Sequence, residues 1–145
     1  MAPLQRRALY TLVIGLAFAV AAVVAFLLAG DVTAFDRDAS LRWITYAALV
    51  GVPLTYLILI DVSLRKPTQL DERDRLVILR SSRVQWLAVV FSLAAWMIAL
   101  TETYRVQGEI PVVFLSLILF STLTISVLAQ SLGILIAYWQ MNRNG

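Results

Sequence analysis

The feature that most constrains the fold is an uncharged run of 23 residues near the N-terminus, ALYTLVIGLAFAVAAVVAFLLAG (residues 8–30). As an α-helix with a rise of about 1.5 Å per residue, this run would reach about 34 Å. The hydrocarbon core of a bilayer is about 30 Å thick, so the run is long enough to cross it. It is also longer than the apolar region of a cleavable signal peptide, which usually has about 7–15 residues. We therefore predict a transmembrane helix over residues 8–30.

Three further apolar runs predict spans at about residues 43–60, 84–100 and 110–139. The last is longer than a span requires, so we expect it to tilt or to project beyond the membrane. Pro111 suits its first helical position, where the missing N–H costs nothing. Only 14% of the residues are charged, against roughly 25% in soluble domains. The prediction is an all-α, four-helix transmembrane bundle that forms a single membrane domain over residues 1–145.

The basic residues are distributed unevenly between the two sides of such a bundle. With a cytoplasmic N-terminus, the three outer ones are Arg37, Arg42 and Arg105. The nine inner ones are Arg6, Arg7, Arg65, Lys66, Arg73, Arg75, Arg80, Arg83 and Arg143. Because cytoplasmic loops carry an excess of Lys and Arg, we predict cytoplasmic N- and C-termini and a multi-pass protein of the cytoplasmic (inner) membrane.

The densest charged segment, KPTQLDERDRLVILRSSRVQW (residues 66–86), precedes the third span. Thr68 and Asp71 have the spacing of a capping box, and Asp71 can pair with Arg75 one turn on. No Gly or Pro follows Arg75 until Gly108. We therefore predict that the third helix extends into the cytoplasm over about residues 69–83. The charges either keep this extension solvated or dock a partner, and a catalytic or metal role is disfavoured because Arg residues compete for the acids. The candidate docking residues are Asp71, Glu72, Arg73, Asp74, Arg75 and Arg80.

The block DERDRLVILRSSR resembles an uncharacterised prokaryotic family of small four-span membrane proteins that carry a cytoplasmic Asp-Glu-Arg-x motif. The resemblance covers roughly residues 70–100, and it implies that residues 71–74 are the motif positions. No activity is established for that family, so the resemblance implies a fold and a location without a mechanism.

Small residues recur along the fourth span at helical spacing, with Gln130 beside them. Such a stripe lets a second helix approach closely, and a Gln can hydrogen-bond across the contact. Three interpretations remain open: packing within the bundle, a homodimer contact, or a substrate path. The candidate residues are Thr122, Ser126, Ala129, Gln130, Gly133 and Ala137. In the second span, Gly51 and Pro53 predict a kink that can act as a hinge.

The sequence contains no Cys and no His, which excludes thiolate chemistry, disulfides and Cys/His metal sites. No acid or base lies near the centre of a predicted span, as ion carriers usually require. We expect no enzyme activity, cofactor, metal or nucleic acid. The partners expected are membrane lipids and either a homo-oligomer or a larger membrane complex.

The leading hypothesis is a scaffold or accessory subunit that acts through the fourth span and the charged inner helix. The alternative is a small transporter or channel along the fourth span, and a lipid enzyme using Asp61, Asp71 or Glu72 is a third.

Overall fold

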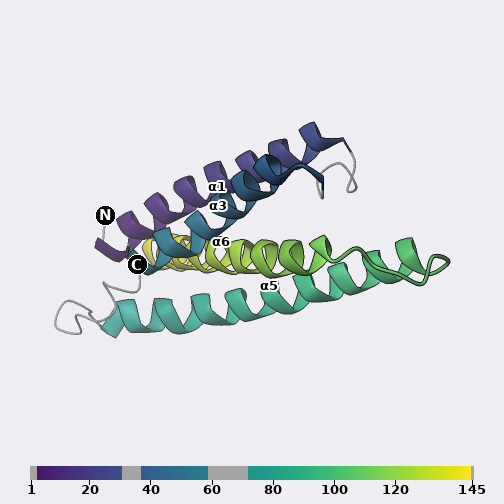
Figure 1. Cartoon of the computed structure of the whole chain (residues 1–145). Helices are drawn as coiled ribbons and strands as arrows, with labels where there is room; N and C mark the ends of the chain where they lie inside the picture. Colours follow the sequence, from purple (N-terminus) through teal and green to yellow (C-terminus); the bar gives the residue numbers. More distant parts are fainter. Residues whose placement is uncertain (1–2, 31–36, 59–71, 145) are drawn as a thin grey trace.

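The computed structural model describes residues 3–30, 37–58 and 72–144 (Figure 1). These residues form four helices and no strand: α1 (Pro3–Ala29), α3 (Ala39–Tyr56), α5 (Glu72–Tyr104) and α6 (Val113–Asn144). The all-α, four-helix expectation is therefore confirmed for this part of the chain. The predicted capping residue Thr68 and the docking candidate Asp71 lie outside the described residues.

Three of the four helices are long and apolar enough to cross a membrane, namely Pro3–Leu28, Glu72–Tyr104 and Val113–Arg143. Helix α3 is not among them. Its 18 residues span about 27 Å, slightly less than the hydrocarbon thickness, and they include Arg42 and Pro53. The second span therefore stays a prediction, and its residues 59–60 lie outside the described part.

Local chemistry explains where the helices begin and end. Asp38 caps α3, because its Oδ1 accepts from the backbone N–H groups of Ser40 (2.9 Å) and Leu41 (3.3 Å). Gly30, with φ 74°, ends α1 in the left-handed conformation that only glycine adopts readily. At the start of α6, the N–H of Phe114 donates to the carbonyl of Pro111 at 3.1 Å. Pro111 therefore precedes the first helical residue by two positions, rather than occupying it as predicted.

Helix α5 is unbroken over 33 residues, as the absence of Gly and Pro after Arg75 predicts. It continues four residues past Leu100, the predicted end of the third span, to Tyr104. Gly108, with φ 71°, then closes the turn, and its N–H donates to the carbonyl of Tyr104 at 3.0 Å.

Helix α6 lies at the centre of the bundle and packs against each of the other three helices (Figure 1). Helices α1 and α3 form an antiparallel pair on one side of it, and α5 packs mainly against α6 on the other. The start of α1 and the end of α6 lie at the same end of the bundle, together with the start of α5.

Two apolar clusters close the bundle, one near each end. The first, here called the Tyr138 cluster, joins three helices through Leu4, Ala8, Val77, Ile134, Ala137 and Tyr138. The second, here called the Phe114 cluster, lies near the α5–α6 connection and contains Leu100, Val113, Phe114 and Leu117.

Large apolar side chains cover the outer surface, among them Leu28, Phe91 and Met97, each at least 70% exposed. A soluble domain rarely exposes apolar area on this scale. The outward-facing residues are instead suited to contact with hydrocarbon.

Candidate functional site

The interface between α5 and α6 is polar at regular intervals along helices whose middle parts are largely apolar outside it. Hydroxyl, amide, carboxyl and indole groups meet there, and all are held by side chains that face the neighbouring helix. The contacts are Tyr138 with Asp74, Gln85 with Ser126 (2.8 Å), Ser92 with Thr122 (3.4 Å) and Trp96 with Ser121 (2.9 Å).

The α5 members of this interface follow a heptad-like pattern. Asp74, Ser81, Gln85, Ser92 and Trp96 are separated by seven, four, seven and four residues. That spacing keeps one face of a helix against an antiparallel neighbour along its length. Because the surrounding residues are apolar, each hydrogen bond contributes about 0.6 kcal/mol to helix association in a membrane.

The two helices approach closely where Gly133 faces Ser81. A Cβ atom on Gly133 would lie 3.0 Å from both the Cα and Cβ atoms of Ser81. The Ser81 hydroxyl is satisfied within its own helix, donating to the carbonyl of Ile78 at 2.8 Å. Gly133 is thus the position at which the two helices have no spare room.

In the structure, residues of the predicted small-residue stripe of the fourth span pack against neighbouring helices of the same chain. Thr122, Ser126 and Gly133 contact α5, and Ala137 belongs to the Tyr138 cluster, which contains residues of both α1 and α5. Ala129 is half-buried. Much of this face therefore packs against helices of the same chain, and whether any of it also serves a path or a second copy stays a prediction.

Gln130 lies apart from those contacts. It is only 4% exposed, and its Oε1 has no hydrogen-bond partner among the described residues. An unsatisfied buried acceptor costs about 1–3 kcal/mol, and the packing of the described helices does not explain why Gln130 is buried.

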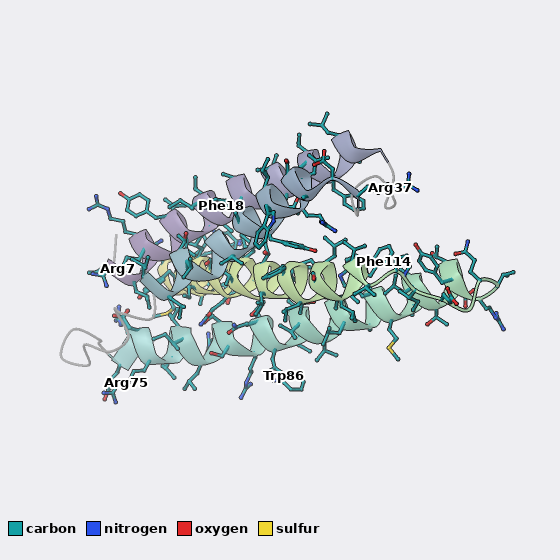
Figure 2. The ribbon with its side chains drawn as sticks, viewed as in Figure 1. Arg7, Phe18, Arg37, Arg75, Trp86 and Phe114 are labelled. Carbon is teal, nitrogen blue, oxygen red and sulfur yellow. The ribbon has the colours of Figure 1, made fainter. Side chains whose placement is uncertain are left out.

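The charged block does not form one surface. Asp74 is 9% exposed and accepts a hydrogen bond from the Tyr138 hydroxyl. Glu72, Arg73, Arg75 and Arg80 are exposed. Figure 2 shows Arg75 on the side of α5 that points away from α6.

The pairing of Asp74 with Tyr138 does not follow from the sequence, although the burial of Asp74 has a sequence signal. Asp74, Val77 and Ser81 are separated by three and four residues, so the acid lies on the same helical face as a buried valine.

The hinge candidates show a packing role in part. A Cβ on Gly51 would lie 3.0 Å from ring atoms of Phe18, so Gly51 lets α3 approach α1 closely. Helix α3 continues past Pro53 to Tyr56, and the Thr55 hydroxyl donates to the carbonyl of Gly51 at 2.8 Å. The hinge itself stays a prediction.

No group of three or more acidic side chains that could hold a metal ion occurs in residues 3–30, 37–58 and 72–144. Within this part of the chain, the structure defines a helical bundle with apolar outer faces and one polar helix–helix interface. A scan against protein-family models, a search of curated proteins and a search of solved structures each found no match. The family resemblance of the charged block therefore stays a prediction.

Proposed function

We propose that this chain is a four-span protein of the cytoplasmic membrane, with both termini inside, that acts as a non-enzymatic scaffold or accessory subunit. The observation that carries the proposal is the outer face of the first turns of α5. There, Leu76 and Leu79 are exposed beside three cationic residues. Glu72 is exposed on the same side, one turn before Leu76. We call this face, formed by Glu72, Arg73, Arg75, Leu76, Leu79 and Arg80, the α5 docking face.

The level of this face in the bundle supports a role at the inner membrane boundary. Ala8 begins the apolar run of α1 and shares the Tyr138 cluster with Val77 of α5. We therefore place Val77 near the start of the hydrocarbon, which shortens the predicted cytoplasmic extension from residues 69–83 to about 69–76. Arg80 then lies about 4.5 Å deeper along the helix. A long Arg side chain can reach back from there to the headgroups. The α5 docking face then presents two leucines and several cations where a partner subunit, or a second copy, can meet both lipid and water.

The remaining surfaces favour α5 as the docking element over the small-residue face of α6. That α6 face already contacts α5 through Ser126 and Thr122. By contrast, α5 packs mainly against α6 alone, so its opposite side is left uncovered by the other described helices.

A site-specific photo-cross-linker distinguishes docking from simple lipid contact. It is placed at Leu79, which is 65% exposed, and at Phe91, a matched control that is 70% exposed within the apolar part of α5. In native membranes we expect a discrete protein adduct from position 79 and only lipid adducts from position 91. Reversing the charges of Arg75 and Arg80 to Glu should weaken the protein adduct. Lipid adducts alone at both positions would contradict the docking proposal.

A second candidate function is a small transporter or channel, and the burial of Gln130 without a partner for its Oε1 favours it. In this proposal, Gln130 supplies a polar point on a path along α6. Flux of small polar solutes into proteoliposomes should then change in Gln130→Leu. An unchanged flux in that variant, or no flux in the parent protein, would remove this candidate.

A further inference from the structure

All four helices line a cavity of about 350 Å³ beside the Phe114 cluster. Its wall runs along α1 from Ala19 to Leu27 and along α6 from Leu117 to Leu128, with Thr45 from α3 and Trp96 from α5. Val23 and Leu27 lie on this wall and are also exposed on the outer surface. The cavity, here called the lateral cavity, therefore opens sideways, toward the surroundings of the apolar helices.

The accessible wall is almost entirely apolar. The Ser121 hydroxyl is already engaged, because it accepts from the Trp96 indole N–H at 2.9 Å and donates to the carbonyl of Ile118 at 3.3 Å. An apolar cavity does not hold water, and the hydrocarbon layer offers none. A hydrocarbon chain is therefore the occupant whose chemistry fits this wall.

The size of the cavity agrees with such a chain. An apolar cavity of about 150 Å³ accommodates one benzene molecule. In the same proportion, 350 Å³ accommodates about 14 carbon atoms, which is most of one acyl chain of a membrane lipid.

Thr45 adds a polar preference to this apolar site. Thr45 and Thr124 both line the cavity and are 1% and 4% exposed, and neither hydroxyl has a hydrogen-bond partner among the described residues. Rotation about the Thr45 Cα–Cβ bond moves its hydroxyl from one staggered position to another, so the hydroxyl can be turned toward the cavity. The rings of Tyr46 and Phe120 lie 5.6 Å apart, so α3 is adjacent to α6 beside Thr45.

The depth of Thr45 suits a lipid ester, whereas Thr124 lies ten residues, or about 15 Å, along α6 from Ile134 of the Tyr138 cluster and so near the middle of the hydrocarbon. Thr45 lies two residues after Trp43, and Trp residues concentrate at membrane–water interfaces. The ester carbonyls of a phospholipid lie at the inner border of that interface, with the chains directed toward the bilayer centre. A carbonyl near Thr45 and a chain extending past Ala22 would thus use both parts of the cavity.

We propose that the lateral cavity binds one acyl chain of a membrane phospholipid and that the Thr45 hydroxyl donates to an ester carbonyl of that lipid. This site is independent of the α5 docking face. Lipid bound here fills the space between the α1–α3 pair and the α5–α6 pair.

Trp96 gives a direct readout because it lines the cavity. The test protein keeps Trp96 as its only tryptophan, with the other three replaced by Phe, and is reconstituted in phosphatidylcholine vesicles whose chains carry bromine. We expect strong quenching of Trp96 fluorescence, reduced about twofold or more in Ala22→Phe, which fills the cavity. The matched control Ala94→Phe, on the exposed side of α5, should be quenched like the parent. Equal quenching of the parent and the Ala22→Phe variant would overturn the site.

A second measurement does not depend on the folding of the filled variant. Unbrominated diester and diether phosphatidylcholines with identical chains compete for the site, and the parent should prefer the diester by about two- to tenfold, as one hydrogen bond allows. The near-isosteric variant Thr45→Val should lose this preference and keep the quenching, whereas the matched control Thr124→Val should keep both. No preference in the parent would overturn the role of the Thr45 hydroxyl. Stronger competition by a free fatty acid than by the diester would overturn the phospholipid as the source of the chain.

Discussion

Enlarging Gly133 tests the close approach of α5 and α6. A Cβ at this position would lie 3.0 Å from backbone and side-chain carbons of Ser81, where ordinary contact begins at 3.4 Å. Gly133→Ala must move the helices apart by a few tenths of an ångström. Overpacking costs about 1–3 kcal/mol, and the better helix propensity of Ala returns about 1 kcal/mol. We expect a net destabilisation of about 0–2 kcal/mol for Ala.

Gly133→Leu should be considerably worse. The larger side chain separates the helices further and weakens the hydrogen bonds on either side, Tyr138 with Asp74 and Gln85 with Ser126. At about 0.6 kcal/mol for each bond, added to overpacking near the upper end of its range, the expected cost is about 3–4 kcal/mol. This corresponds to more than a hundredfold change in the unfolding equilibrium.

Unfolding titrations with denaturing detergent in mixed micelles measure this change, with Ala94→Leu as a control that adds a larger side chain on an exposed part of α5. A second readout uses the absence of cysteine from the chain. The Ser92 and Thr122 hydroxyl oxygens lie 3.4 Å apart, so a cysteine pair at these positions should oxidise readily, and more slowly with Leu at position 133. A Gly133→Leu protein as stable as Ala94→Leu, with undiminished cross-linking, would refute the close packing.

Three further outcomes are expected. Tyr138→Phe removes the donor to the buried carboxylate of Asp74, and should destabilise the bundle by about 1–3 kcal/mol in the same titration; the effect should be smaller when Asp74 is already replaced by Ala. Gln85→Leu removes the hydrogen bond to α6 and should cost about 0.6 kcal/mol, and at most about 1.7 kcal/mol. For the proposed orientation, a membrane-impermeant thiol reagent should label Arg75→Cys only from the cytoplasmic side and Arg105→Cys only from the outside. Labelling from the opposite sides would reverse the topology.

Some features of the site were readable from the sequence and others were not. The stripe containing Thr122, Ser126 and Gly133 identified residues suited to close helix contact, because spacing alone places them on one face. Spacing does not identify the partner helix, however, since all four helices offer apolar faces and hydrocarbon supplies no preference among them. The structure assigns these three residues to contacts with α5.

The charged block illustrates the same division. The sequence predicts one group of charged residues, whereas the rotation of α5 buries Asp74 and leaves Glu72 and Arg75 exposed. That separation depends on which face of α5 meets α6, and therefore on tertiary packing.

The start of α6 differs slightly from the prediction. The sequence predicts Pro111 at the first helical position, whereas α6 begins at Val113. The difference of two residues is within the error that helix boundaries usually carry.

The sequence by itself determined that the chain forms long apolar helices with one charged segment, because an apolar run of sufficient length satisfies its own backbone hydrogen bonds and needs no knowledge of its neighbours. The tertiary structure alone decided that α6 is the central helix, that Tyr138 meets Asp74, and that a lateral cavity remains beside Thr45 and Thr124. These features depend on the relative rotation and separation of helices. Side-chain shape sets both quantities, and residues far apart in the sequence contribute to each.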